Sequence, residues 1–194
     1  MQNLAIENKR EAILTAALTT FKNYGYRKTS MQDISTALGM SRASLYTYFA
    51  NKDDIFRCAL ISVTESGLVE AKRCLGLSAL DLTSRVEAAL LARYLPLHQM
   101  LIESVHGEEI AETYFRLCGD SFADSFAQSK DILTATLKSA NRKKEIDLKG
   151  AFLTAPVASE LLNLTLLGLR HTSTDIEIYK MRVNRFVNVF MRGL

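Results

Sequence analysis

Residues 29–49 read "TSMQDISTALGMSRASLYTYF" and carry the signals for two short helices joined by a tight turn. Ser30 precedes Asp33 by three residues, which is the spacing of a capping box at a helix N-terminus. Gly39 is placed to end this first helix, and Ser41 is placed to cap the second. Two short helices with a Gly-containing turn between them form the pattern of a helix-turn-helix.

The second of these helices, predicted over residues 42–49, has an outer face of small and hydroxyl side chains. At about 100° per residue, Leu45 and Phe49 fall on one side and are the expected inward anchors, whereas Thr47 points away from them. Such a face suits the major groove of DNA, because small residues allow close approach to base edges and hydroxyls bond to phosphates or bases. A helical hairpin with half-buried tyrosines is the alternative explanation of the same composition.

Two cations border this segment. Arg42 lies in the first turn, from which it can reach a guanine, and Lys52 begins the next predicted helix, where an ammonium and a helix N-terminus together suit a phosphate. Residues 1–60 hold eight basic and five acidic side chains, which accounts for the whole formal charge of +3. A positive bias at one end favours an anionic partner there, although a chance distribution of surface charges would look the same.

The rest of the chain is also predicted to be helical, because only Pro96 and Pro156 interrupt it and no stretch alternates with period two. Thr174 and Glu177 have capping-box spacing at the start of the last helix. Pro96 is expected to kink or split its helix. The predicted helices cover residues 4–24, 31–38, 42–49, 52–75, 82–105, 107–118, 120–141, 148–170 and 174–192.

Several classes of protein are not favoured by the sequence. No apolar run is long enough to span a bilayer, and the N-terminal residues suggest an amphipathic helix in place of a signal peptide. Cys58, Cys74 and Cys118 are odd in number and widely spaced, which predicts free thiols in a reducing compartment. We therefore expect a cytoplasmic protein. Enzymatic motifs such as G-x-S-x-G, a phosphate-binding glycine loop or H-E-x-x-H do not occur, so neither an enzyme, a metal site nor a cofactor is predicted.

Residues 10–60 resemble the DNA-binding domain of the TetR family of transcriptional regulators. The resemblance rests on Phe-x-x-x-Gly-Tyr at the end of the first helix, Thr-Ser before the second, Ala-x-Gly at its end, and Ser-x-x-x-Leu-Tyr-x-Tyr-Phe followed by a lysine. It implies an all-α homodimer with an N-terminal three-helix helix-turn-helix DNA-binding domain, residues 1–52. A C-terminal helical ligand-binding and dimerisation domain, residues 53–194, would follow, with the fourth helix linking the two.

The same resemblance implies a dimeric one-component regulator, usually a repressor, that binds a pseudo-palindromic double-stranded DNA operator and is released by a small-molecule effector. In the family, DNA contacts come from the start of the second helix, the recognition helix and the first residue of the fourth. Ala43 stands where the family commonly has Gly, and Thr47 where it often has His. The matching residues of this sequence are Thr29, Ser30, Arg42, Ala43, Ser44, Tyr46, Thr47, Tyr48 and Lys52.

The last two predicted helices are apolar around much of their circumference, which requires burial on more than one side. In the TetR family such a pair forms a four-helix dimer interface with its two-fold mate, and the alternative is a pair that is central in one protomer. The candidate interface residues are Leu161, Leu164, Gly168, Val183, Phe186, Val187 and Phe190.

An effector pocket is expected among the middle helices, for an apolar or aromatic small molecule with a few polar groups. Each candidate residue has an ordinary surface or core position as its alternative. Two other functions are kept open: a helical protein-interaction module, and a family member that activates transcription or lacks an effector. The candidate pocket residues are Tyr94, His98, Glu103, His106, Tyr114 and Cys118.

Overall fold

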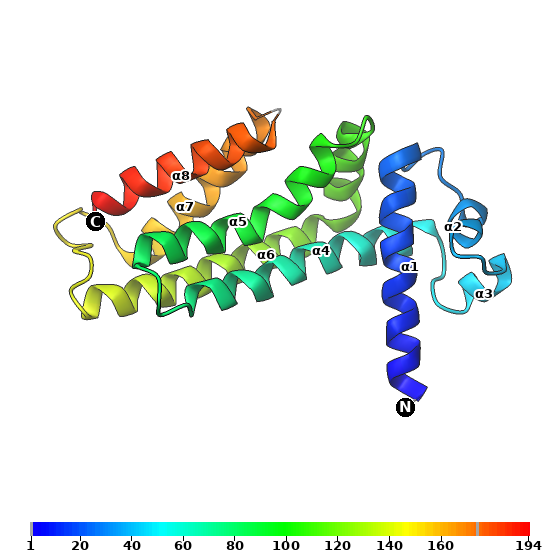
Figure 1. Cartoon of the computed structure of the whole chain (residues 1–194), viewed down its shortest axis with the longest axis horizontal. Coiled ribbons are helices and arrows are strands. Elements are labelled where there is room, and N and C mark those ends of the chain that lie inside the picture. The colour runs from blue at the N-terminus through cyan, green and yellow to red at the C-terminus, as the bar shows by residue number, and fades with distance from the viewer. Residues whose placement is uncertain (1, 174) are drawn as a thin grey trace. The chain divides into compact units, whose positions relative to one another are not determined.

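The computed structural model describes residues 2–173 and 175–194, and within these ranges it contains eight α-helices and no strand (Figure 1). The predicted all-α fold class is therefore confirmed. None of the helices in this described part is both long and apolar enough to cross a membrane. The helices are α1 (Gln2–Tyr24), α2 (Met31–Ala37), α3 (Arg42–Tyr46), α4 (Lys52–Leu75), α5 (Leu82–Ile102), α6 (Gly107–Arg142), α7 (Ala155–His171) and α8 (Ile176–Arg192).

Two predicted helix boundaries in the second half of the chain were wrong. The helices expected over 107–118 and 120–141 are one helix, α6, which is kinked at Cys118, where φ is −125° and ψ is 16°. The helix expected from residue 148 begins only at Ala155, because Lys144 and Phe152 before it have positive φ angles of 61° and 55° that do not fit a right-handed helix. Thr154 is its N-cap and Pro156 lies in its first turn, where proline is favoured.

The remaining helix ends follow local capping. The recognition helix α3 ends at Tyr46, three residues earlier than expected, with Thr47 as its C-cap. At the start of α8, the side chain of Asp175 accepts a hydrogen bond of 2.9 Å from the Ile178 N–H. The capping box predicted to begin at Thr174 falls on a residue outside the described ranges.

The chain packs as two units. The first comprises the chain up to Val63 together with Met100–Ser121, and the second comprises Thr64–Gln99 and Phe122–Leu194. The boundary between them therefore falls within α4, α5 and α6. The division of roles into residues 1–52 and 53–194 remains a prediction, but in packing terms the first unit also takes in the end of α5 and the beginning of α6.

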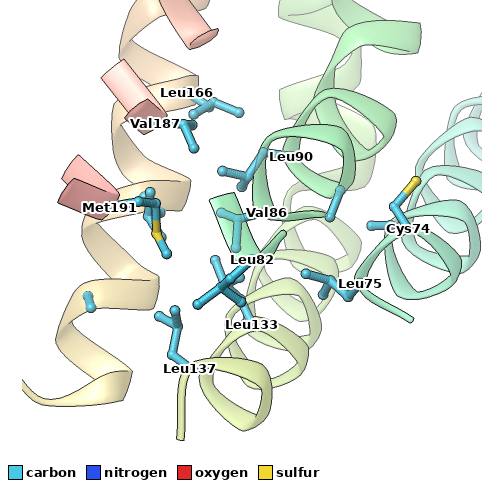
Figure 2. Close-up of a cluster of buried hydrophobic side chains, with 14 of the residues drawn as sticks. Cys74, Leu75, Leu82, Val86, Leu90, Leu133, Leu137, Leu166, Val187 and Met191 are labelled. Atoms are coloured by element: carbon cyan, nitrogen blue, oxygen red, sulfur yellow. The ribbon is translucent and has the colours of Figure 1, made fainter. Parts of the chain in front are cut away.

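The core of the second unit is apolar and draws on five helices. Figure 2 shows Cys74 and Leu75 from α4, Leu82, Val86 and Leu90 from α5, and Leu133 and Leu137 from α6 in one cluster with side chains of α7 and α8. In α8 these are Val187 and Met191, and α7 contributes Leu166. Burial of such side chains is the main favourable term in folding, at about 1.5–3 kcal/mol for each large aliphatic side chain.

The backbones of α4 and α5 approach each other closely at Gly67. Pro96 lies inside α5, and it cannot donate the hydrogen bond that the Ala92 carbonyl would otherwise accept. Gly67 of α4 faces this same stretch: a Cβ added to it would lie 3.0 Å from the Arg93 carbonyl oxygen and 3.1 Å from that of Ala92. Glycine therefore allows the two backbones to meet closely at this point.

Candidate nucleic-acid interface

The short helix α3 is held by its cap and by two buried anchors. Leu45 and Phe49 are 0% and 1% exposed, which confirms their predicted inward position. The Ser44 N–H donates to Ser41 Oγ at 3.0 Å, so Ser41 caps the helix as predicted. Leu45 is buried in the same unit as Ile34 of α2, and α2 contacts both α1 and α3. A helix of only five residues is not stable alone, so these contacts determine its position.

The capping box of α2 is also confirmed. The Asp33 N–H donates to Ser30 Oγ at 3.2 Å, and the Ser30 N–H donates to Asp33 Oδ2 at 2.8 Å. These bonds, together with the Ser30 hydroxyl, lower the pKa of the Asp33 carboxyl below its usual value. Ser30 remains exposed at the N-terminus of α2.

The opposite face of α3 is exposed. Arg42, Tyr46 and Thr47 all lie at the surface, and so do the small residues Ala43 and Ser44 between them. The Arg42 guanidinium donates from Nη2 to the Tyr46 hydroxyl at 3.1 Å, which uses one of its five N–H donors. The Thr47 hydroxyl donates to the Ser44 carbonyl at 2.7 Å and keeps its acceptor lone pairs. The predicted outward face therefore exists, although Thr47 lies just beyond the helix end.

Tyr48 is only half-exposed, because it lies at the edge of this face. Its carbonyl oxygen accepts a hydrogen bond of 2.7 Å from Nη1 of Arg10 on α1. The Arg10 guanidinium also lies 4.3 Å from the centre of the Phe49 ring, as in a cation–π contact. Arg10 thus ties the end of the recognition segment to α1, a role that no sequence signal indicated.

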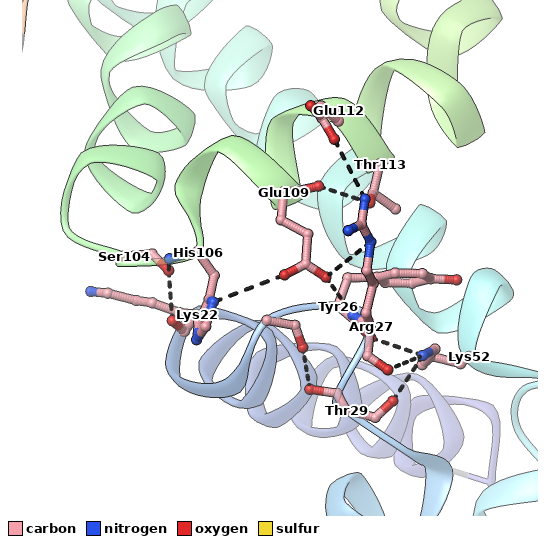
Figure 3. A network of polar contacts seen from close by, with 11 residues as sticks. Lys22, Tyr26, Arg27, Thr29, Lys52, Ser104, His106, Glu109, Glu112 and Thr113 are labelled. Carbon is pink, nitrogen blue, oxygen red and sulfur yellow. Dashed lines mark hydrogen bonds and ion pairs between the residues drawn. The ribbon is translucent and has the colours of Figure 1, made fainter.

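Two of the residues matched to DNA contacts instead support the turn between α1 and α2. Thr29 is 2% exposed, and its hydroxyl donates to the Gly25 carbonyl at 2.6 Å. The Lys52 ammonium donates to the carbonyls of Tyr26 and Thr29 at 2.8 and 2.9 Å and lies 4.3 Å from the Tyr26 ring (Figure 3). Burial lowers the pKa of Lys52. In this geometry the ammonium is directed into the protein and closes the turn.

The tyrosine beneath this ammonium is fixed at both ends. Its ring packs edge-on against Phe56, with the centroids 4.9 Å apart, and its hydroxyl donates to Asp53 Oδ1. Burial, followed by the bond to Asp53, raises the pKa of Tyr26 to about 12. Tyr26 therefore stays neutral at all physiological pH values, and its ring is held in a fixed position against Lys52.

A carboxylate at the start of α6 binds the same turn. Glu109 Oε1 accepts from the Arg27 N–H at 2.5 Å, and Glu109 Oε2 lies 3.9 Å from Nδ1 of His106 (Figure 3). Gly25 is favoured here because its φ of +79° lies in the left-handed region, and a Cβ would also lie 2.6 Å from Glu109 Oε2, so that the Glu109 side chain would have to shift. Sequence analysis missed Glu109: its place in the first turn of a helix predicts only a favourable helix-dipole interaction, not this partner.

The six candidate pocket residues divide between the units. In the first unit, Glu103 pairs with Lys22 at 2.6 Å and His106 with Glu109, both near the surface. Tyr114 and Cys118 are buried there, and burial raises the pKa of the Cys118 thiol to about 11. Only Tyr94 and His98 belong to the second unit.

Tyr94 and His98 lie in a buried polar cluster. The Tyr94 hydroxyl donates to Asn163 Oδ1 at 2.7 Å, and the Ser129 hydroxyl donates to the same oxygen at 2.7 Å. The His98 ring lies 4.4 Å from the Tyr179 ring. Within the described part of the chain, His98 Nε2 and the Tyr179 hydroxyl are buried without a hydrogen-bond partner. Burial, with the positive charges of Arg170 and His171, lowers the pKa of His98 to about 4, so its ring is neutral.

The candidate dimer residues also fall into two groups. Leu161 and Leu164 of α7 are exposed, and a Cβ added to Gly168 would meet no atom within 4 Å. In contrast, Val183 and Val187 of α8 are fully buried in the core of their own protomer, which leaves no surface of theirs free for a second copy; their place at a dimer interface stays a prediction. Phe186 and Phe190 are partly buried, with ring centroids 5.6 Å apart. The exposed apolar side chains of α8 are Ile178, Met181 and Val189.

Comparison with known proteins supports the helix-turn-helix interpretation. Residues 13–59 match the family described as bacterial regulatory proteins, tetR family. The uncharacterized HTH-type transcriptional regulator YfiR of Bacillus subtilis (strain 168) is 40% identical over 74 residues, which are 38% of this chain and 34% of that protein. The chain thus matches curated relatives over about a third of their length.

Solved structures share the fold along nearly the whole chain. A transcriptional regulator from Cytophaga hutchinsonii ATCC 33406 superimposes with a TM-score of 0.79 at 22% identity, covering 95% of this chain and 97% of that one. SmeT, the repressor of the Stenotrophomonas maltophilia multidrug efflux pump SmeDEF, has been solved in complex with triclosan. It superimposes with a TM-score of 0.67 at 18% identity, covering 93% and 90% of the two chains.

A three-helix domain that presents an exposed α3 above two buried anchors defines a helix-turn-helix DNA-binding protein. The match over residues 13–59 then specifies the family of this segment: it is a DNA-binding domain of the tetR family of bacterial regulatory proteins.

Proposed function

We propose that this protein is a dimeric one-component repressor that binds a pseudo-palindromic DNA operator through α2 and α3 and releases it when a small molecule binds the second unit. The observation that carries the proposal is the exposed face of α3, on which Arg42, Tyr46 and Thr47 project away from Leu45 and Phe49. Such a regulator acts where the chromosome is, so we place it in the cytoplasm.

On DNA, the exposed residues divide into those that read bases and those that bind phosphates. Arg42 and Thr47 are assigned to base edges, and the absence of bulk at Ala43 and Ser44 lets the helix approach them. Tyr46 and Ser30 are assigned to phosphates, for which hydroxyl groups are common donors. Thr29 and Lys52 contribute by holding the turn that positions α2, since their polar atoms already bond within the protein.

Dimerisation is proposed through α7 and α8. Along α7, Val157, Leu161, Leu164 and Gly168 recur at helical spacing and are exposed in the protomer. Along α8, Val189 is 73% exposed, beside similarly exposed Ile178 and Met181. A contiguous apolar face of this kind on a single protomer is typical of a protein–protein interface, and the open space at Gly168 would permit close backbone approach.

Release by a small molecule is proposed because the second unit has polar groups that its own fold leaves unsatisfied. The repressor SmeT, which shares the fold, has been solved with triclosan bound, and this supports a ligand of mixed apolar and polar character here. By thermodynamic linkage, effector and operator must weaken each other's binding by the same factor.

The test is to select an operator from a pool of random duplexes and to measure its affinity by fluorescence anisotropy at several salt concentrations. We expect a two-fold symmetric sequence and a linear fall of log affinity with log salt concentration. A transcriptional reporter behind that operator should be repressed. A protein-interaction module would give neither symmetry nor a salt slope on DNA, and an activator would raise the reporter signal.

A further inference from the structure

The second unit contains an open cavity of about 310 Å³ where α4 ends, α5 begins and α6 ends. It is lined by Leu75 and Leu82, by the hydroxyl residues Thr136 and Ser139, and by the cations Arg85 and Lys143 with the carboxylate of Glu145. Volumes of this order hold small ligands in proteins. The combination of aliphatic side chains with two cations and one carboxylate suits a molecule that has both an apolar part and a negative charge.

The guanidinium of Arg85 is incompletely used within the protein. Its Nη1 donates to the Leu75 carbonyl at 3.3 Å, at the end of α4. Its Nη2 lies 3.6 Å from Glu145 Oε2, well beyond the roughly 2.8 Å of a good charge-assisted hydrogen bond. Its Nε is buried and has no hydrogen-bond partner among the described residues. Nη2, the guanidinium nitrogen that faces Glu145, therefore has only a loose internal partner.

Glu145 is held loosely from its other side as well. Its Oε1 lies 3.9 Å from the Lys143 ammonium, and the side chain of Lys143 is largely exposed. Two cations thus surround one carboxylate without a close contact to either. A ligand carboxylate that displaced Glu145 and bonded to Arg85 and Lys143 would gain the hydrogen bonds that Glu145 does not make.

A second, narrow cavity lies next to the first. It also lies between α4, α5 and α6, shares Leu75 with the first cavity, and is lined by aliphatic side chains such as Leu90 and Leu133 (Figure 2). Its volume is about 10 Å³, room for about one water molecule. Ser129 lines it too, and its hydroxyl is already donated to Asn163. Because Leu75 lines both cavities, a ligand tail would enter the second only if Leu75 moved aside, and a thin alkyl chain needs less room there than a ring.

We propose that this is a binding site for an amphipathic monocarboxylate, with the carboxylate on Arg85 and Lys143 and an unbranched alkyl tail between α4, α5 and α6. The inference names the chemical class of the effector, and it rests on the proposed function only in identifying this ligand with the effector. Binding itself is a property of the second unit and is measured without DNA.

The test is calorimetric titration of the whole protein with octanoate, decanoate and decan-1-ol below their micellar concentrations. Each added buried methylene should raise affinity by about fourfold, so decanoate should bind about 16-fold more tightly than octanoate. Decan-1-ol, which lacks the charge, should bind at least about 10-fold more weakly than decanoate, because a hydrogen bond to a charged group contributes about 1.5–3 kcal/mol. Equal binding of the acid and the alcohol, or no dependence on chain length, would overturn the proposal.

Three variants locate the head group. Glu145→Gln removes the competing carboxylate and should tighten decanoate binding by about twofold to fivefold, whereas Lys143→Gln should weaken it by a similar factor. Arg85→Gln should weaken it by at least about 10-fold. Arg73→Gln, an exposed arginine paired with Glu70, is the matched control and should leave affinity unchanged.

Because Arg85 also bonds to the end of α4, its variant could lose stability, but the Glu145 and Lys143 variants alter exposed side chains and keep the test decisive. If neither changes decanoate affinity, the site is wrong. If decanoate binds with these dependences but does not release the operator, the site stands and the release step of the proposed function fails. If operator binding itself is absent, the proposed function fails while the titration still decides the site.

Discussion

The two units differ in how completely their inward-facing polar groups are satisfied. In the first unit, Thr29 and Lys52 are satisfied by main-chain carbonyls of a single turn, and Glu109 accepts the Arg27 N–H of that turn. In the second unit, His98 Nε2 and the Tyr179 hydroxyl are buried with no partner among the described residues. Leaving such a group unsatisfied costs about 1–3 kcal/mol, which the surrounding fold must offset.

This difference fits different functions for the two units. A surface that reads DNA must hold α3 at a fixed position. The residues that support it, Thr29, Lys52 and Glu109, therefore have their polar groups hydrogen-bonded within the protein. A unit that responds to a ligand or a second protomer needs groups that can still bind one. In the second unit these are polar atoms in the core without a hydrogen-bond partner among the described residues, and exposed apolar side chains on α7 and α8.

The largest effect is expected from a charge in the core of the second unit. Val187→Asp places a carboxylate among aliphatic side chains and should lower the free energy of unfolding by about 3–5 kcal/mol, because a buried charge without a partner is strongly destabilising. Leu161→Asp, on the exposed stripe of α7, should leave the protomer folded and shift the protein towards monomers. Urea unfolding and sedimentation separate the two outcomes. A stable Val187→Asp dimer would contradict the assignment of Val187 to the core.

Removal of the Lys52 ammonium tests whether its hydrogen bonds to the turn between α1 and α2 stabilise the first unit. Lys52→Met keeps the apolar stem over Tyr26 but leaves the carbonyls of Tyr26 and Thr29 without their donor, which should cost about 2 kcal/mol of stability. Lys72→Met, at an exposed position of α4, is the control and should be close to neutral. DNA affinity should fall through loss of the positioned α2. A variant of wild-type stability that only lowers the salt slope would restore Lys52 to the role of a direct phosphate contact.

Arg42 tests base reading on the exposed face. Arg42→Ala should weaken operator binding by about 1–3 kcal/mol per half-site and change affinity for random DNA little, because the guanidinium discriminates between bases. Tyr46→Phe removes one hydroxyl and should cost about 0.5–1.5 kcal/mol per half-site with specificity retained. The ratio of operator to random-DNA affinity at fixed salt is the measurement. An unchanged ratio for Arg42→Ala would mean that Arg42 binds only the backbone.

His98 makes the second unit sensitive to acid. Its folded pKa of about 4 lies below the ordinary value of 6.5, so above pH 6.5 the residue is neutral in both states and has no effect. As pH falls below 6.5, the unfolded chain takes up the proton first, and the folded state should lose about 2 kcal/mol between pH 7 and pH 5.

The variant His98→Phe keeps a ring against Tyr179 and should remove most of this loss, whereas His171→Gln, at an exposed position, takes away only the smallest cause of the lowered pKa of His98 and should remove little of it. Free energies of unfolding at the two pH values decide the matter. The same acid sensitivity in wild type and His98→Phe would assign it to other groups.

The reliability of the sequence predictions followed the range of the interactions involved. The capping box at Ser30, the cap at Ser41 and the anchors Leu45 and Phe49 depend on neighbours within four residues, and all were found as predicted. Their geometry follows from helical spacing alone, and for this reason the order of the amino acids is enough to predict a helix-turn-helix.

Interactions between distant residues could not be predicted in the same way. The partners of Lys52 lie 23 and 26 residues away, and Glu109 lies 82 residues from Arg27, so no spacing rule connects them. On α8, all apolar residues look alike in the sequence, and only packing shows that Val187 faces its own core whereas Val189 is exposed. A sequence pattern that is apolar on two sides of a helix predicts two contact surfaces. It does not show which side packs in the core of the protomer and which is exposed.

The close approach of α4 to α5 at Gly67 has a consequence for how α4 can move. Packed helices resist sliding because the side chains of one lie in the grooves of the other, and a displacement must lift them out. At Gly67 no side chain of α4 stands between the two backbones, so a displacement of α4 along its own axis would be opposed mainly by side chains further along the helix, such as Cys74 and Leu75, which pack in the same core as α5. A rigid rod that begins at Lys52 and ends at Leu75 would carry such a displacement from one end to the other. In Gly67→Ala the added methyl group would press on the Arg93 carbonyl, so this substitution should oppose the displacement of α4.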